Sequence, residues 1–251
     1  RLLPTIDSLG ATIGRGELIA GRIDLKGQTV DLGTFSGSGL RAAYIAPDSA
    51  TIAATPVVPA DTSTTSAPWT VRIDSLAFDR SSALYTTRGV TPLPGLDFGY
   101  IAVDSLSLNI NDFYNQAATV RIPVRVSGTE RCGVRLDASG MLDIGETGLE
   151  FKDFNLSTRL GTALSFGGLL GMGDMTTDPN VPLRLNLKGK VSTGDARLMF
   201  PAFLPYLAAM PPHGGVEADI ALAGTSGALD IDRLDVTVNT VARLSASGQC
   251  V

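Results

Sequence analysis

The sequence is poor in the residue types that carry most enzyme chemistry, with one histidine and two cysteines among 251 residues. A Ser-His-Asp triad or a zinc site needs more of them. The single histidine lies in Pro211-Pro212-His213-Gly214-Gly215, which predicts a surface turn. We therefore expect no catalytic residues, no metal ligands, no cofactor and no enzymatic activity.

The two cysteines follow similar local text, Glu130-Arg131-Cys132 and Gly248-Gln249-Cys250. Neither has the electropositive surroundings of an activated thiolate. A disulfide requires Cα atoms within about 7 Å of each other, which nothing in the spacing indicates. Free buried thiols, or cysteines whose partners lie outside this chain, are favoured over a disulfide between the two.

Basic residues are not in surplus, since 20 Lys and Arg face 25 Asp and Glu for a formal net charge of -5. This balance excludes nucleic acid as a principal partner. There is no apolar run of about 18 residues and no secretory signal pattern. The chain begins at Arg1 and stops within an apolar-polar alternation at Gln249-Cys250-Val251. We interpret it as a segment of a longer protein, whose targeting and anchoring elements can lie elsewhere.

Two sets of residues resemble ligand sites only superficially. Gly37-Ser38-Gly39 and Gly171-Met172-Gly173 lack the Lys-Ser/Thr and the strand-to-helix context of a phosphate loop. Asp230, Asp232 and Asp235 flank an aliphatic strand without the spacing and closing glutamate of a calcium loop. Neither set predicts a binding site.

Aromatic residues are also scarce, at 6% against 44% hydrophobic residues in all, whereas there are 28 glycines and 14 prolines. Such a composition is typical of many strands and turns around an aliphatic interior. We expect β repeats over residues 1–46, a Pro/Thr/Ser-rich loop over 47–68, and further β repeats over 69–251. The fold class is therefore predicted to be mainly all-β.

Two stretches interrupt the strand pattern, and we expect short helical inserts near 158–175 and 195–210. In the second, Asp195 is placed as an N-cap, while Pro201 and Pro205 predict a short or broken helix. We expect both inserts to cap a sheet edge or the end of a groove. Contact with a membrane or with lipid is the alternative.

Three stretches alternate strictly between apolar and polar residues, so that one face of each strand is aliphatic and the other polar. They begin near Val120, Val181 and Val216. Pro123 and Pro182 fall on the polar phase and lack a backbone donor. The strands should be bulged or locally unpaired at these prolines.

A short phrase, apolar-Asp-Ser-Leu, recurs along the chain. Its copies are Ile6-Asp7-Ser8-Leu9, Ile73-Asp74-Ser75-Leu76 and Val103-Asp104-Ser105-Leu106, with looser versions at Ile231-Asp232-Arg233-Leu234 and Phe151-Lys152-Asp153-Phe154. The apolar phase inverts across the phrase, and one extra residue would restore a single apolar face. This predicts repeated β-bulges that curve the sheet. A tight turn at which strands pass to another sheet is the alternative.

A sheet curved in this way can hold its aliphatic stripe as a concave trough. Acyl chains suit such a trough, because each buried CH₂ contributes about 0.8 kcal/mol without a directional partner. The residues predicted to line it are Ile73, Val103, Leu106, Leu108, Ile110, Val120, Ile122, Val124, Val126, Leu183, Leu185, Leu187, Ile220, Leu222, Leu234, Val236 and Val238.

Longer phrases give the chain a resemblance to a known family. The Arg-Leu-x-Ala-Ser-Gly phrase closes two units, at 135–140 and 243–248. The run Val181-Pro182-Leu183-Arg184-Leu185-Asn186-Leu187-Lys188-Gly189 is followed by Phe200-Pro201-Ala202, Ala221-Leu222-Ala223-Gly224-Thr225 and Leu229-Asp230-Ile231. Together with the tetrads, these phrases resemble the AsmA/TamB family, most densely from Trp69 to Val251.

The resemblance implies an envelope protein of diderm bacteria, anchored in the inner membrane through a segment outside this chain. It implies an elongated, curved, antiparallel or mixed β-sheet in the periplasm that forms a taco-like hydrophobic groove. The partners it implies are phospholipids moving between the two membranes and, for TamB, an outer-membrane barrel protein. The family has no catalytic residues to transfer.

Two other functional hypotheses stay open at this point. The groove or an open sheet edge could receive strands of nascent outer-membrane proteins by β-augmentation, as an assembly scaffold or chaperone does. A β-solenoid adhesin or surface fibre is the third, and a dry, closed core would favour it.

Overall fold

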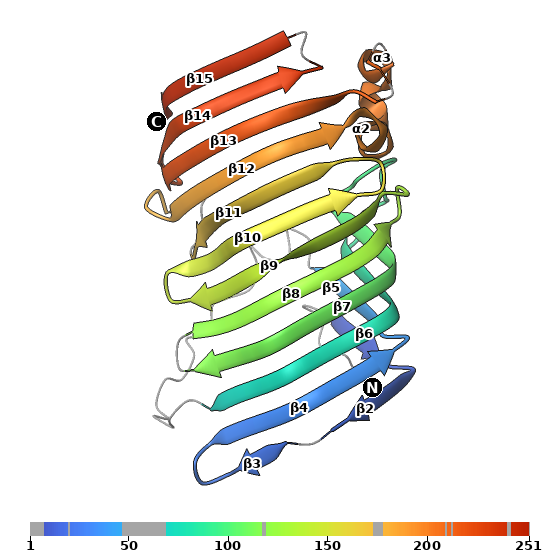
Figure 1. The fold of residues 1–251 in the computed structure, drawn as a ribbon, viewed down its shortest axis with the longest axis vertical. Helices are drawn as coiled ribbons and strands as arrows, with labels where there is room; N and C mark the ends of the chain where they lie inside the picture. Colours follow the sequence, from blue (N-terminus) through green and yellow to red (C-terminus); the bar gives the residue numbers. More distant parts are fainter. Residues whose placement is uncertain are drawn as a thin grey trace.

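The computed structural model describes residues 8–19, 21–46, 69–116, 119–172, 178–208, 210–211, 213–239 and 242–250. The predicted loop 47–68 lies outside these residues, as do Ile6 and Asp7 of the first tetrad. The described strands form one curved, unclosed sheet of 15 strands (Figure 1). The prediction of a mainly all-β, elongated fold is confirmed.

The first strands of the sheet are β1 Ser8–Thr12, β2 Arg15–Leu18, β3 Arg22–Asp24, β4 Thr29–Ser38, β5 Arg41–Ala46, β6 Thr70–Thr87, β7 Tyr100–Gln116 and β8 Thr119–Glu130. The others are β9 Arg135–Gly145, β10 Gly148–Thr158, β11 Ala163–Gly171, β12 Pro182–Ser192, β13 Gly215–Thr225, β14 Ala228–Val238 and β15 Ala242–Cys250. A helical segment, α2 Thr193–Met199, η1 Pro201–Phe203 and α3 Leu204–Leu207, connects β12 to β13.

The sheet is mixed, but most of it is an antiparallel meander. From β6 to β15 the strands follow chain order, each antiparallel to the next. β4 and β5 both pair parallel with β6, β4 along its first half and β5 along its second. β1, β2 and β3 then line the outer side of β5 and β4.

Bulges occur at three of the tetrads, where the sequence predicts them. The register shifts between Asp104 and Ser107 in β7, between Lys152 and Asn155 in β10, and between Ile231 and Leu234 in β14. Ser105 and Asp153 adopt positive φ of 52° there. Each strand continues through its bulge within the same sheet, so the alternative of a turn between two sheets is wrong.

The bulges keep the apolar side chains on one face although their sequence phase inverts. In β7, for example, Val103 and Leu106 both lie beside Gly128 of β8. A Cβ at Gly128 would come within 2.5 Å of Cγ1 of Val103, so only glycine leaves room for this side chain. An extra residue in one strand thus keeps the face continuous.

At the tetrad of residues 73–76 the predicted shift is not found between β6 and β7, whose register stays constant from Ile73 to Leu76. The irregularity appears one strand further, where β7 shifts against β8 between Ile110 and Tyr114 and Asp112 has a φ of 52°. Pro123 of β8 lies opposite this shift. Its missing N–H is therefore placed where β7 offers no regular partner, as the sequence predicts.

Two expectations about the inserts need correction. The stretch near 158–175 is not helical, because the described part of it is the end of β10, a turn and β11. Gly167 and Gly168 lie inside β11, and a Cβ at Gly168 would be 2.2 Å from the carbonyl oxygen of Arg184 on the neighbouring strand. These glycines allow close strand approach, so they do not break the sheet.

The second insert is helical and broken at its prolines, as predicted, but its N-cap is Ser192 and not Asp195. Ser192 Oγ accepts a hydrogen bond from Asp195 N at 3.1 Å. Asp195 is instead in the first helical turn, where its carboxylate accepts from Ser192 Oγ at 2.7 Å. Ser192 therefore caps the helix, and the Asp195 carboxylate holds the capping hydroxyl in place.

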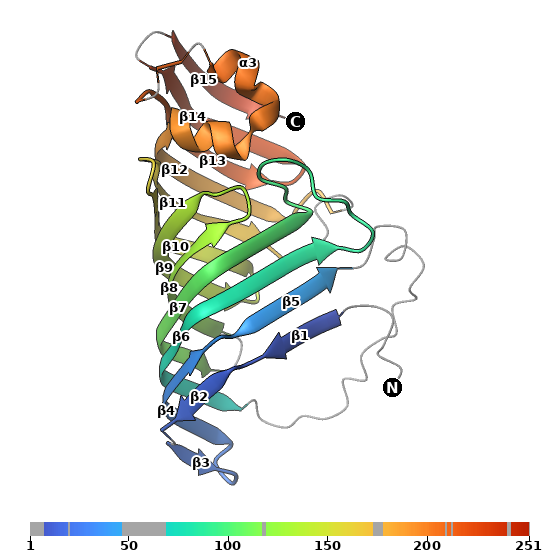
Figure 2. The ribbon, with the colours of Figure 1, turned by 90° about the vertical axis from the view of Figure 1, so that its right-hand side faces the viewer.

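The strands curve toward the side that carries the helical segment (Figure 2). Thr158 lies in the cross-strand row of Leu136, on the apolar face, and its hydroxyl donates to Asp195 of α2. The helical segment therefore sits on the apolar side, and the apolar face is the concave one. The sheet is an open groove with an apolar lining.

Candidate functional site

The structure places every predicted lining residue on this concave face. Several of them lie directly opposite one another on adjacent strands. These pairs are Leu108 with Val126, Ile110 with Val124, Leu185 with Leu222, Leu187 with Ile220, and Ile220 with Leu234. They form two groups, one on β6 to β8 and one on β12 to β14. Directly opposite side chains on antiparallel strands share a face, so each group is a continuous apolar surface.

The strands between the two groups contribute lining residues that the sequence interpretation missed. Phe151, Phe154 and Phe166 form a cluster on β10 and β11 with ring centroids 5.2 to 6.1 Å apart. Phe154 covers Gly140 of β9, where a Cβ would lie 2.5 Å from its ring. Phe166 pairs in turn with Leu187, which joins the two groups.

The apolar face has no second layer over most of its area. Every predicted lining residue is only half-buried. Among the described residues, the buried hydrophobic side chains are Val134, Val181, Ala196 and Ala221, and none of them belongs to the predicted lining. A soluble monomer seldom exposes a contiguous apolar patch of more than a few hundred Å². The face is thus suited to an apolar occupant.

The convex face is polar and carries a network of ion pairs that connects β8, β9, β10 and β12. Asp143 of β9 accepts from Arg121 at 3.0 Å and from Lys152 at 2.8 Å. Lys152 also lies 3.0 Å from Glu150, which bonds Arg184 at 2.8 Å. The hydrogen bond from Arg121 lowers the pKa of Asp143. Burial opposes this effect, but Arg121 and Lys152 together outweigh it, so the pKa lies below its usual value.

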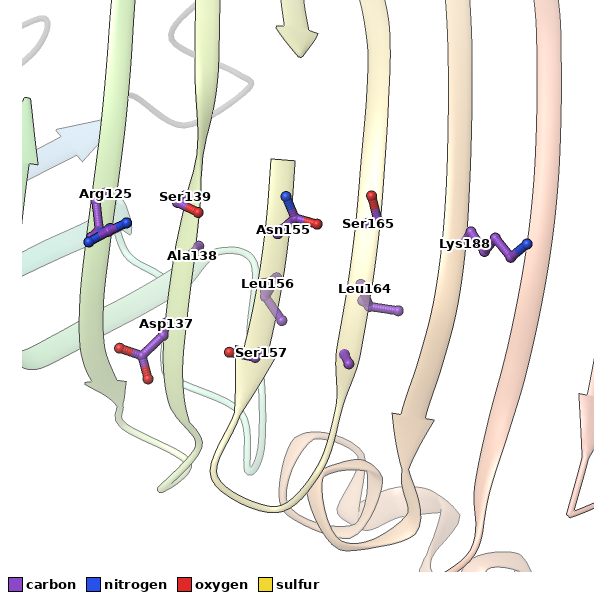
Figure 3. A pocket seen from close by; sticks show the side chains of 11 residues that line it. Arg125, Asp137, Ala138, Ser139, Asn155, Leu156, Ser157, Leu164, Ser165 and Lys188 are labelled. Carbon is purple, nitrogen blue, oxygen red and sulfur yellow. The ribbon is translucent and has the colours of Figure 1, made fainter. Parts of the chain in front are cut away.

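A hollow of about 550 Å³ opens on the side of the polar residues, over β8 to β12 (Figure 3). One cross-strand row, Arg125, Ser139, Asn155, Ser165 and Lys188, runs through it. The lining contains hydroxyl, amide and cationic groups, the carboxylate of Asp137, and the apolar side chains of Ala138, Leu156, Ala163 and Leu164.

One rim of the groove, which we call the capped rim, is formed by the ends of β6, β8, β10 and β12 and carries the helical segment. Residues 88–99 reach across to it, since Leu96 N donates to Met199 O at 2.8 Å although β7 and β12 are five strands apart in the sheet. Arg131 donates to the carbonyl oxygens of Leu93 and Gly95. The capped rim is thus folded inward over the concave face.

Asp195 anchors the helical segment to this rim. It is fully buried, and its Oδ2 accepts hydrogen bonds from the hydroxyls of Thr158, Thr162 and Ser192. Burial alone would raise the pKa of Asp195, but these hydrogen bonds outweigh it and leave the pKa below its usual value. The carboxylate therefore holds the cap through hydrogen bonds from hydroxyl groups.

The remaining candidate residues form no reactive site. His213 is exposed. Cys132 is free and half-buried, and burial, with Glu130 beside it, raises the pKa of its thiol. The side chain of Cys250 lies outside the described residues. Over the described ranges, no group of His, Cys, Asp and Glu could hold a metal ion.

None of the described helices is both long and apolar enough to cross a membrane. Comparison of the chain with protein-family models, curated proteins and solved structures finds no match in any of the three.

Proposed function

We propose that this chain is the periplasmic segment of an AsmA/TamB-like envelope protein, whose groove carries phospholipid acyl chains between the inner and outer membranes. The full-length protein is anchored in the inner membrane through a segment outside this chain. The observation that carries the proposal is the concave face, which is lined by aliphatic side chains over most of the sheet and lacks a covering layer.

The physical argument is the match between this face and a hydrocarbon chain. Burial of an acyl chain contributes about 0.8 kcal/mol per CH₂ and requires no hydrogen-bonding partner. The sheet continues the apolar rows from strand to strand, so a chain can shift along them without meeting a charged residue of the convex face. This smooth surface supports passage as well as binding.

A site-specific photocrosslinker tests the proposal at neighbouring positions of one strand. Leu185 and Asn186 of β12 lie on opposite faces, Leu185 in the groove and Asn186 exposed on the convex side. We expect crosslinking to phospholipid in cells from position 185 and not from position 186. Labelling that is equal at the two positions, or stronger at 186, would contradict lipid binding in the groove.

The edge strand β15 favours a second candidate function, a scaffold for outer-membrane protein assembly. In the described part of the chain β15 pairs with β14 alone, and its side chains are exposed throughout residues 242–249. Such an edge can accept an added strand. A crosslink from position 245 to a barrel protein that survives removal of lipid would favour this function over lipid transport.

A further inference from the structure

An exposed apolar patch projects from the capped rim, and the groove does not account for it. It comprises Leu93 and Phe98 of the 88–99 segment and Phe200, Phe203, Leu204 and Tyr206 of the helical segment. We call it the rim patch. These side chains are 40% to 76% exposed, far more than the half-buried groove residues.

The two parts of the rim patch belong to one surface. In the 88–99 segment, the backbone N–H of Leu96 donates to the carbonyl oxygen of Met199 at the end of α2. A Cβ at Gly95 would lie 2.4 Å from Cδ of Pro201, so the two segments approach closely here too. In Figure 2 the 88–99 segment runs directly below the helices, on the concave side. The patch therefore continues the apolar lining of the groove outward at this rim.

The charged groups around the rim patch are turned to internal partners. Arg197 is the one charged residue in 196–208, and its guanidinium donates to the carbonyl oxygens of Leu207 and Met210. Asp97 is the one charged residue in 89–99, and its carboxylate accepts from the backbone of Leu93 and Gly99. Asp97 is thus the one carboxylate of these two segments, and both of its oxygens accept backbone hydrogen bonds.

We propose that the rim patch docks onto a phospholipid bilayer and places the capped rim of the groove against it. The inference rests on the proposed function, because it names the side from which lipid would enter or leave. Aromatic and leucine side chains partition into the membrane interface, and one carboxylate and one guanidinium group lie among these. The patch projects from the sheet and offers few hydrogen-bonding groups, whereas a protein interface of standard size has about ten hydrogen bonds.

Flotation with vesicles of phosphatidylethanolamine and phosphatidylglycerol tests this inference. The test variant is Phe203→Ser/Tyr206→Ser. The matched control is Ile23→Ser/Leu25→Ser, which removes two equally exposed apolar side chains at β3 and its turn, away from the rim patch. We expect the test variant to lose about tenfold in vesicle binding and the control to bind as the unaltered chain does.

Three results would overturn the rim inference. They are no vesicle binding by the unaltered chain, equal loss in the control, and unchanged binding by the test variant. A test variant that changes a dimer to a monomer in sedimentation while vesicle binding persists would assign the patch to a second copy of the chain instead.

Crosslinking from position 185 separates the failure of this inference from the failure of the proposed function. If the crosslinker at position 185 labels a monomeric lysophospholipid and the rim variant binds vesicles as the unaltered chain does, the rim inference alone is overturned. Vesicle binding that depends on the rim patch, with no labelling at 185, overturns lipid transport through the groove alone.

Discussion

At the scale of single residues, the buried carboxylate of Asp195 decides how the cap is attached. Three hydroxyl donors from β10, the following turn and the end of β12 converge on one oxygen atom, Oδ2. A buried hydrogen bond to a charged group contributes more to the free energy of unfolding than a hydrogen bond between neutral groups. If the carboxylate is removed, the donors that it accepted from are left unpaired, which is costly. The attachment of the cap therefore depends on this residue.

The variant Asp195→Ala should lower the free energy of unfolding by about 3 kcal/mol, because it leaves the hydroxyls of the buried Thr162 and Ser192 and of the half-buried Thr158 without their acceptor. Chemical denaturation monitored by circular dichroism measures this. The control is Asp230→Ala on the exposed side of β14, which should change stability by less than about 0.5 kcal/mol. Equal effects of the two substitutions would show that Asp195 does not anchor the cap.

Ser105 is the second residue on which the fold depends, since it holds a φ of 52° inside β7. A left-handed conformation costs a residue with a Cβ about 1 kcal/mol. Ser105→Gly should therefore raise the free energy of unfolding by up to about 1 kcal/mol, and Ser105→Val should lower it by more than that. Asn109→Gly, in the regular part of the same strand, should be destabilising by about 0.5 to 1 kcal/mol. Stabilisation by both glycine variants would contradict a strained bulge.

At the scale of elements, neighbouring strands are held together from the convex side by charge. Asp143, Lys152 and Glu150 connect β9 and β10 to Arg121 of β8 and Arg184 of β12. Exposed ion pairs are weak singly, but Asp143 is largely buried and accepts from two cations. The network contributes to strand register where the concave face lacks a second layer.

This network gives the sheet a dependence on pH. The pKa of Asp143 is lowered in the folded state, so its contribution is complete above the unfolded value of about 3.9 and is lost as the pH falls through the folded pKa. Asp143→Asn should destabilise the chain at pH 7, and the difference from the unaltered chain should shrink as the pH falls below about 4. Denaturant unfolding between pH 7 and pH 2.5 measures this, and a constant difference would rule out Asp143 as the source.

At the scale of the whole molecule, the groove exposes an apolar face that an amphiphile can cover. A lysophospholipid below its micellar concentration should raise the Tm by about 5–10 °C at one hundred times its Kd, because a ligand that binds only the folded state stabilises it. Leu185→Asp should abolish the rise, while Asn186→Asp on the convex face should keep it. Differential scanning calorimetry measures both, and a rise that survives Leu185→Asp would place the amphiphile elsewhere.

The sequence by itself determined the strand content, the apolar phase of β8, β12 and β13, and the positions of three bulges. These are local properties, because the period of a strand fixes which side chains share a face and an inverted phase requires an extra residue. The same local text could not identify β11 as a strand. Its glycines, Gly167 and Gly168, are explained by the close approach of the neighbouring strands, which depends on distant residues.

The tertiary structure alone decided which face is concave, how the phenylalanines of β10 and β11 join the two lining groups, and where the helical segment attaches. Asp195 was recognised as a helix-start residue, but its partners Thr158 and Thr162 come from the end of β10 and the turn after it, more than thirty residues away. The approach of residues 88–99 to the cap likewise follows from the curvature summed over many strands. Periodicity along the chain is a local signal. Which segments come together when the sheet bends is set by packing between residues far apart in sequence.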